Sequence, residues 1–366
     1  MKYAESDLVR IAKRENNTKR KYLVVDPLQG KHIPVMPSRA LNLFTSLADT
    51  FRNEYKNERL LLVGFAETAT AIGAQVAISI GAKYIQTTRE QIPSVNYLFF
   101  SEEHSHATEQ KLVKDDIDAV VSDVDRLVFV EDEVTTGNTI LNIIKILDEE
   151  YSGKLKYSVA SLMNGMAAEH LELYRSKGIR LHYLVKTDHS NYGDKADEFA
   201  GNGHYFDCLD KSEADCATIN VDNRMDARRV VDSNEYKAAC ENLWLEIRNE
   251  IDNVSGKKIL VVGTEEFMFP ALYVGQQLEK NGNTVLCHST TRSPIAVSLE
   301  NDYPLHCRYE LKSVYDSERR TFIYDIGEYD RVFVITDSPE TDSEGQRTLV
   351  NALKTYNDNI TVIRWC

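Results

Sequence analysis

The sequence predicts an α/β protein with two doubly wound parallel-sheet domains. From residue 59 to residue 185, short apolar runs alternate with segments whose apolar residues recur every three or four positions. The same alternation begins again at Gly256 and continues to Cys366. The 366-residue chain is also too long for one ordinary domain. Because strands that alternate with helices pair in parallel, we expect helices on both faces of each sheet.

The elements of the first block follow from these patterns. Short apolar runs predict strands at residues 22–25, 59–64, 83–87, 97–100, 126–131, 156–162 and 180–185. Helical spacing of apolar residues predicts helices at residues 38–55, 66–80, 107–121, 138–150 and 167–177.

The regions outside the two blocks are less regular. Residues 1–20 are polar and charged, and we expect a loose N-terminal arm there. Periodicity is lost between residues 187 and 232, which predicts a linker or a lid, and residues 234–252 form a strong helical pattern. The predicted parts are therefore an arm at 1–20, a first domain at 21–187, a linker or lid with a connecting helix at 188–254, and a second domain at 255–366.

The second block resembles the first in sequence. Residues 61–67, 88–89 and 125–132 are similar to residues 260–266, 291–292 and 330–337. The offsets of 199, 203 and 205 residues drift only slightly, as loop insertions would make them. All α/β units look alike to some extent, but the matched Thr-Arg and Asp-Arg pairs favour a duplication.

Composition excludes several classes of protein. A chain with 42% hydrophobic and 27% charged residues is typical of a globular protein. It contains no apolar run of the roughly 18 residues needed to span a membrane, and its first residues lack the apolar core of a secretory signal. Six scattered cysteines without a Cys-x-x-Cys pair argue against a zinc site or a disulfide framework, so we expect a cytoplasmic protein. The net charge of −14 opposes nonspecific nucleic-acid binding.

The most informative stretch is residues 127–139. An apolar strand ends in two carboxylates, Glu131 and Asp132, and a small polar loop then leads into a helix. The loop and helix start consist of Thr135, Thr136, Gly137, Asn138 and Thr139. Free N–H groups and the positive dipole end of a helix favour an anion, and two acids suit paired sugar hydroxyls with Mg²⁺ nearby. The pattern predicts a site for a 5-phosphorylated ribose; the alternative is an ordinary strand-to-helix turn.

At these residues the chain resembles the type I phosphoribosyltransferases. Their signature is a hydrophobic strand, two acids, two or three residues and then Thr-Thr-Gly or a close variant. The resemblance implies their fold for the first domain, and the second domain would be a degenerate copy. It implies phosphoribosyl pyrophosphate as donor, a small-molecule acceptor, and Mg²⁺ as cofactor. Glu131 and Asp132 would hold the ribose hydroxyls, stabilise the transition state, and hold Mg²⁺ directly or indirectly.

The resemblance also implies a pyrophosphate loop and a mobile loop. The candidate pyrophosphate loop, at a helix start, is formed by Ala66, Glu67, Thr68 and Ala69. His104 and His106 lie where the family has its mobile loop, and they either contact pyrophosphate or move a proton, or are solvated loop residues. Arg89 and Lys111 are weaker candidates for contacts to the leaving group.

The second copy is not expected to bind the donor. Residues 340–343 read Glu-Thr-Asp-Ser where the first copy has Thr-Thr-Gly-Asn. The added acids at a helix start would repel a phosphate.

The whole chain resembles proteins encoded in bacterial tellurite-resistance and stress-response clusters, which join a phosphoribosyltransferase domain to a TRSP domain. The Thr-Arg-Ser-Pro motif stands at residues 291–294, where Arg292 either contacts a ligand or belongs to a polar turn. Thr135 stands where oxo-purine salvage members have Asp, so the resemblance favours a pyrimidine-like or nucleoside-precursor acceptor. A non-catalytic sensor of the donor and a scaffold stay open as alternatives. A homodimer and contact with cluster-encoded proteins stay open as assemblies.

Overall fold

The computed structural model describes residues 3–15, 20–100, 110–208, 215–251, 255–340 and 343–366. The chain forms two compact units, each assembled from segments that are not consecutive in sequence. The first unit comprises Met1–Glu5, Leu41–Asp188 and Met225–Ala238. The second unit comprises Ser6–Ala40, His189–Arg224 and Ala239–Cys366.

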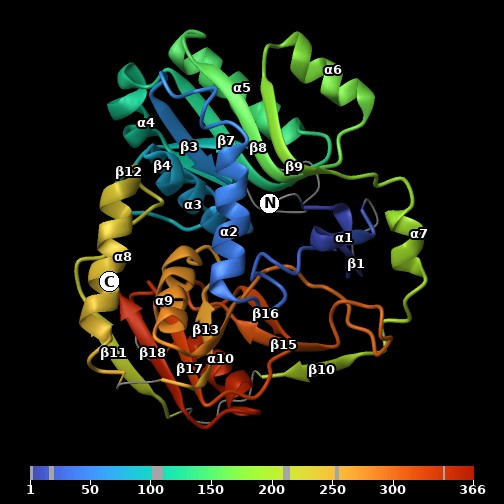
Figure 1. The fold of residues 1–366 in the computed structure, drawn as a ribbon, viewed down its shortest axis with the longest axis vertical. Helices are drawn as coiled ribbons and strands as arrows, with labels where there is room; N and C mark the ends of the chain where they lie inside the picture. Colours follow the sequence, from blue (N-terminus) through green and yellow to red (C-terminus); the bar gives the residue numbers. More distant parts are fainter. Residues whose placement is uncertain (1–2, 16–19, 101–109, 209–214, 252–254, 341–342) are drawn as a thin grey trace. The chain divides into compact units, whose positions relative to one another are not determined.

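The first unit is built on a six-stranded sheet in the order β12-β4-β3-β7-β8-β9 (Figure 1). The five strands from β4 to β9 pair in parallel, and β12 pairs antiparallel to β4 at one edge. The strands are β3 (Leu60–Gly64), β4 (Lys83–Gln86), β7 (Arg126–Val134), β8 (Lys156–Asn164), β9 (Arg180–Lys186) and β12 (Val231–Asp232). The predicted parallel α/β sheet is confirmed.

Helices join these strands at the predicted places, with one exception. The helices are α3 (Thr70–Ile80), α4 (Lys114–Val120), the 3-10 helix η1 (Val121–Asp123), α5 (Asn138–Tyr151) and α6 (Ala168–Ser176). The helix expected at 107–121 is wrong at its start. β6 (Gln110–Val113) pairs antiparallel with β5 (Tyr97–Phe100), and α4 follows only at Lys114. An antiparallel hairpin therefore separates β4 from β7.

The second unit is built on a five-stranded parallel sheet in the order β11-β18-β17-β13-β14. Its strands are β11 (Ala217–Val221), β13 (Lys258–Gly263), β14 (Thr284–Ser289), β17 (Arg331–Thr336) and β18 (Ile360–Trp365). A three-stranded sheet adds β10 (His204–Asp207), β15 (Cys307–Lys312) and β16 (Arg320–Tyr324). Its helices include α7 (Tyr192–Asp197), α9 (Phe269–Lys280) and α10 (Glu344–Lys354).

The strand order supports the duplication. In each unit the first four core strands lie in the order second, first, third, fourth: β4-β3-β7-β8 and β14-β13-β17-β18. An antiparallel pair stands between the second and third of these strands in both units, as β5–β6 and as β15–β16. The fifth place differs, because β9 fills it in the first unit and β11, from an earlier part of the chain, fills it in the second.

Matching hydrogen bonds support the same conclusion at the level of single residues. The carboxylate of Asp125 accepts from the backbone N–H of Arg59 at 2.8 Å, and Asp330 accepts from Lys258 at 2.8 Å. These pairs stand 205 and 199 residues apart, as the sequence repeat requires. The second unit is thus a copy of the first fold.

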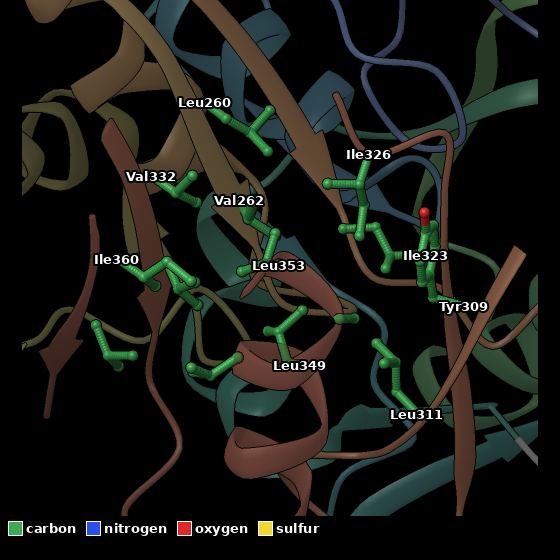
Figure 2. Close-up of a cluster of buried hydrophobic side chains, with 14 residues drawn as sticks. Leu260, Val262, Tyr309, Leu311, Ile323, Ile326, Val332, Leu349, Leu353 and Ile360 are labelled. Carbon is green, nitrogen blue, oxygen red and sulfur yellow. The ribbon is translucent and has the colours of Figure 1, made fainter. Parts of the chain in front are cut away.

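One apolar cluster of the second unit joins its five-stranded sheet to a helix and a hairpin (Figure 2). Helix α10 contributes Leu349 and Leu353, and the β15–β16 hairpin contributes Tyr309 and Ile323. All four side chains are buried together with residues of β13, β17 and β18. The hairpin, which is a separate sheet by its pairing, therefore shares its core with the parallel sheet.

Two regions expected to be irregular are structured. The N-terminal segment forms α1 (Glu5–Leu8), β1 (Arg10–Lys13) and β2 (Tyr22–Val25), so the expectation of a loose arm at 1–20 is wrong for its described residues. Ala12 and Val25 are buried beside Ile295 and Phe322 in a second apolar cluster. In the expected linker or lid, β10 and β11 are strands of the second unit's sheets.

Three helices contain a division point between the segments of the two units. These helices are α1, α2 (Pro37–Asp49) and α8 (Ser233–Ile247). The division expected from the sequence, into an arm, a first domain, a linker with a connecting helix and a second domain, stays a prediction. None of the helices in the described ranges is long and apolar enough to cross a membrane.

Candidate active site

The two carboxylates of the sequence motif stand near the end of β7, the central strand of the first unit's sheet. Glu131, Asp132 and Glu133 are half-buried, after five fully buried strand residues. Burial and the neighbouring charge of Glu133 raise the pKa of Asp132 to about 6, and a hydrogen bond from the Thr68 hydroxyl opposes this rise. The charge of Glu133 therefore acts on Asp132 at the end of this strand.

The loop after β7 has the geometry of an anion-binding helix start. Gly137 adopts φ 75° and ψ 8°, in the left-handed region, and its carbonyl accepts from Leu141 N at 3.0 Å as α5 begins. Asn138 N makes a long contact of 3.3 Å with the Thr136 hydroxyl. The N-cap residue of α5 is Gly137, which has no side chain to cap the helix, and a helix start of this kind can bind an anion.

A buried tyrosine is bonded to the backbone of this loop. Tyr174 on α6 is fully buried, and its hydroxyl donates to the Gly137 carbonyl at 2.6 Å. A Cβ at position 137 would lie 2.3 Å from the Tyr174 hydroxyl and 2.6 Å from Met166 Cε. Glycine is therefore required at position 137 both by its backbone angle and by its neighbours.

The second loop follows β3. Thr87 Oγ1 accepts from Ala66 N at 2.8 Å and donates to Gln110 Oε1, while Gln110 Nε2 donates to the Ala66 carbonyl at 2.7 Å. Polar side chains thus bond both the N–H and the carbonyl of Ala66. The turn leads into α3, which likewise starts without a side-chain cap among the described residues.

A buried tyrosine also stands behind this second loop. The Tyr84 hydroxyl donates to the Thr70 carbonyl at 2.7 Å in the first turn of α3. A Cβ at Gly64 would lie 2.5 Å from that hydroxyl, and a Cβ at Gly73 would lie 2.8 Å from the ring. The two glycines let the side chain of Tyr84 pack directly against the backbone at the end of β3 and in the first turn of α3.

The acids and the two loops occupy one edge of the sheet. β3 and β7 are neighbours, with Gly64 paired to Val130, so the turns that follow them lie at the same carboxyl end. The hydrogen bond between Thr68 and Asp132 links the second loop to the acids. In open α/β sheets, ligands bind outside the carboxyl ends of the strands.

Other predicted site residues are placed differently. His104 and His106 lie outside the described residues. Lys111 is buried; its ammonium donates to Gln91 at 2.9 Å and lies 4.7 Å from the ring centroid of Tyr97. Arg89 is half-buried and follows Thr88, whose backbone pairs with that of Lys111.

Arg292 of the Thr-Arg-Ser-Pro motif lies in the second unit. Its guanidinium bonds to the buried carboxylates of Glu265 at 2.7 Å and Glu266 at 3.3 Å. Other residues of the motif also bond to distant segments. The Ser293 carbonyl accepts from the Tyr324 hydroxyl at 2.6 Å, and the Pro294 carbonyl accepts from Glu15 N at 3.1 Å. The motif thus joins several segments of the second unit.

The corresponding edge of the second unit is closed by its own side chains. Asp337, the counterpart of Asp132, is paired with Arg224 and accepts from the Tyr315 hydroxyl at 2.6 Å. Ser343 caps α10 by accepting from Gln346 N at 3.2 Å. The N-cap of α10 is therefore a serine that caps the helix, whereas the N-cap of α5 is a glycine; that only the first copy binds a phosphate stays a prediction.

The chemistry of the acids at the end of β7 fits a divalent cation such as Mg²⁺. Carboxylate oxygens are its preferred protein ligands, and crowded acids with a raised pKa gain from a nearby positive charge. The described residues contain no cluster of three or more metal-ligating side chains. The donor set therefore suits a cation that one or two carboxylates share with a ligand's oxygens.

Sequence comparison identifies the family. Residues 8–189 match the phosphoribosyl transferase family, and residues 228–353 match the TRSP domain that stands C-terminal to it. The chain belongs to the phosphoribosyl transferases that carry a C-terminal TRSP domain. The predicted family is confirmed. None of the curated proteins matches the chain.

Solved structures similar to this phosphoribosyl transferase include adenine phosphoribosyltransferases. The enzyme from Rhodothermus marinus is 13% identical and is matched over 50% of this chain and 96% of its own, with a TM-score of 0.35. The Giardia lamblia enzyme, complexed with 9-deazaadenine, is 19% identical over 50% and 95%, also with a TM-score of 0.35. At these TM-scores the likeness carries no argument about this chain.

Sequence analysis did not identify several residues around the candidate site. Tyr84, Tyr174, Thr87 and Gln110 contact the two loops but do not belong to the motifs. The repeat offers a signal for one of them, since Thr290 in the second unit accepts from Glu265 N at 3.0 Å as Thr87 does from Ala66. A threonine matched in both copies indicates a bond that the shared fold requires.

Proposed function

We propose that this protein transfers a 5-phosphoribosyl group from phosphoribosyl pyrophosphate to a small-molecule acceptor. The observation that carries the proposal is the arrangement of two uncapped helix starts at neighbouring strand ends, joined by the hydrogen bond between Thr68 and Asp132. A donor with a monophosphate at one end and a pyrophosphate at the other needs two such anion sites with a ribose between them.

Each part of the site then has one role. The N–H groups of residues 135–139 bind the 5-phosphate, and the turn at 66–69 binds the pyrophosphate. Glu131 and Asp132 accept hydrogen bonds from the ribose hydroxyls and stabilise the positive charge that develops on the ribose ring as the bond to pyrophosphate breaks. The half-buried position of both acids suits them to this charge, because it weakens screening by water.

Mg²⁺, when bound, would neutralise the pyrophosphate as it leaves. The chain's own residues would hold the cation through Glu131 and Asp132 and would orient the donor through the two loops. The negative charge of Glu67 in the second loop makes a cation near the pyrophosphate more important there.

For the acceptor, Thr135 favours a pyrimidine-like base or a nucleoside precursor over an oxo-purine. The Thr-Arg-Ser-Pro motif favours a role in a stress-response or tellurite-resistance pathway, in the cytoplasm. Both proposals rest on the family resemblance of single motifs, so the donor is tested first.

The test is calorimetric titration of the full chain with phosphoribosyl pyrophosphate and Mg²⁺. We expect Asp132→Asn to weaken binding by about 10-fold or more, because hydrogen bonds to charged groups contribute roughly 1.5–3 kcal/mol. Asp123→Asn is the matched control, since it removes the same charge from an exposed carboxylate before the start of β7. No heat with the wild-type protein, at concentrations that detect millimolar affinity, would refute the proposal.

Catalysis is tested separately by pyrophosphate release with candidate bases. Release that depends on both donor and acceptor would establish transfer. Tight donor binding without release in the presence of any acceptor would favour the alternative of a non-catalytic sensor. Absence of donor binding would leave the scaffold alternative.

A further inference from the structure

Each of the two anion loops has a buried tyrosine behind it, and the two arrangements are alike. In both, a phenol donates to a backbone carbonyl at a helix N-terminus, at 2.6 Å for Tyr174 and 2.7 Å for Tyr84. In both, the aromatic side chain lies so close to a glycine that a Cβ would overlap with it. Both tyrosines are fully buried, so neither can touch a ligand in solution directly.

The carbonyls that accept these bonds are informative. Gly137 is the residue that precedes α5, and Thr70 is the first residue of α3. The carbonyl of Gly137 shares a planar peptide group with the N–H of Asn138, and that of Thr70 shares one with the N–H of Ala71. A bond that fixes the direction of the carbonyl therefore fixes the direction of an N–H group in the first turn of the helix; in α5 this N–H also makes the long contact with the Thr136 hydroxyl.

The same bonds strengthen those N–H groups as donors. A hydrogen bond accepted by a carbonyl polarises its peptide group, so the attached N–H becomes a stronger donor to an anion. The phenols are well suited to this, because burial raises the pKa of both Tyr84 and Tyr174, and the nearby charge of Glu131 adds to the rise at Tyr174. Both groups therefore remain protonated donors at neutral pH.

We propose that Tyr174 and Tyr84 are positioning residues, Tyr174 for the loop that binds the 5-phosphate and Tyr84 for the loop that binds pyrophosphate. This inference rests on the proposed function. Each tyrosine acts through the peptide group that it fixes and does not contact the donor. The two roles are separate because the contacts of Tyr174 are with Gly137 at the start of α5, whereas those of Tyr84 are with Gly64 at the end of β3 and with Thr70 and Gly73 in the first turn of α3.

Two half-ligands separate the two roles. Ribose 5-phosphate probes the loop before α5, and pyrophosphate with Mg²⁺ probes the loop before α3. We expect Tyr174→Phe to weaken ribose 5-phosphate by about 2- to 10-fold and to leave pyrophosphate unchanged, since a net hydrogen bond contributes about 0.5–1.5 kcal/mol. We expect Tyr84→Phe to weaken pyrophosphate by the same factor and to leave ribose 5-phosphate unchanged.

Tyr157→Phe is the matched control for stability. The Tyr157 hydroxyl donates to Asp148 at 2.8 Å, near the opposite end of α5. Its removal also costs the helix one phenol hydrogen bond, but far from the open N-terminus. We expect it to lower the melting temperature without changing the affinity for either ligand.

The outcomes distinguish this inference from the proposed function. If the wild-type protein binds neither half-ligand nor the donor, the proposed function fails. If the wild-type binds both half-ligands and the two variants weaken both equally, or weaken neither, the positioning roles are refuted while the function stands. If one variant does not fold, the other still decides, because each predicts a loss for one ligand and none for the other.

Discussion

Replacing Gly137 by alanine tests the geometry of the phosphate loop most directly. The left-handed backbone at φ 75° costs a residue with a Cβ roughly 1–2 kcal/mol. The new Cβ would also lie 2.3 Å from the Tyr174 hydroxyl and 2.7 Å from its Cζ, so the ring must move. Forcing extra volume into a packed site costs about 1–3 kcal/mol. We therefore expect Gly137→Ala to lower the free energy of unfolding by about 2–5 kcal/mol.

The control is Gly153→Ala, after the other end of the same helix. Gly153 also has a left-handed backbone, at φ 63°, but nothing lies within 4 Å of its missing Cβ. Gly153→Ala should therefore lower the free energy of unfolding by only the backbone term of roughly 1–2 kcal/mol. The assay is urea unfolding of both variants, followed by intrinsic fluorescence, with ribose 5-phosphate affinity measured beside it.

Equal losses of stability in the two variants would refute the account of the loop, because the contact with Tyr174 would then have no energetic consequence. Unchanged ribose 5-phosphate affinity in a folded Gly137→Ala protein would refute the assignment of this loop to the phosphate. The double variant with Tyr174→Phe, which removes the closest atom, should recover part of the lost stability.

Three further changes probe the second unit. Burial lowers the pKa of His288 from 6.5 to about 4. The contribution of neutral His288 to the free energy of unfolding is therefore complete above pH 6.5 and is lost as the pH falls toward 4. Urea unfolding across this range should show a loss of up to about 3 kcal/mol, and His288→Gln should remove this pH dependence. Ser343→Ala should lower the free energy of unfolding by about 1 kcal/mol, because the cap on Gln346 N is lost, and a change below the error of thermal unfolding would contradict it. Lys31→Met should lower the free energy of unfolding by about 1.5–3 kcal/mol, because the buried ammonium donates to two carbonyls. Lys145 is exposed, so Lys145→Met should leave the free energy of unfolding unchanged in the same assay.

The turn and acids of the proposed phosphate loop could be placed on their elements from sequence because their information is local. Glu131, Asp132 and Gly137 stand within a few residues of one another, on a strand end, a turn and a helix start that the sequence marks clearly. The repeat was visible for a similar reason, since the matched pairs Thr88-Arg89 and Thr291-Arg292 each occupy two consecutive positions. Local patterns thus predicted the alternation of strands and helices and the turn expected to bind an anion.

What the sequence could not predict depends on contacts between distant residues. Tyr174 meets Gly137 across 37 positions, and no pattern around Tyr174 distinguishes it from an ordinary buried aromatic residue. The strand β6 was predicted as helix, because Gln110–Val113 runs directly into the helical pattern of α4 and gains its strand structure from pairing with β5. The strand β1 is short and mostly polar, and it is recognisable only by its partner β2.

The two copies of the fold let this chain serve as its own comparison. Asp125 and Asp330 make the same carboxylate bond, one in each copy, which indicates that the shared fold uses this bond. The open start of α5 and the capped start of α10 differ, so they report what the scaffold itself does not demand. A designer who wished to give the second copy a ligand would therefore leave the paired bonds alone and rebuild only the turn before α10. The chain already shows that the same framework accepts either kind of turn.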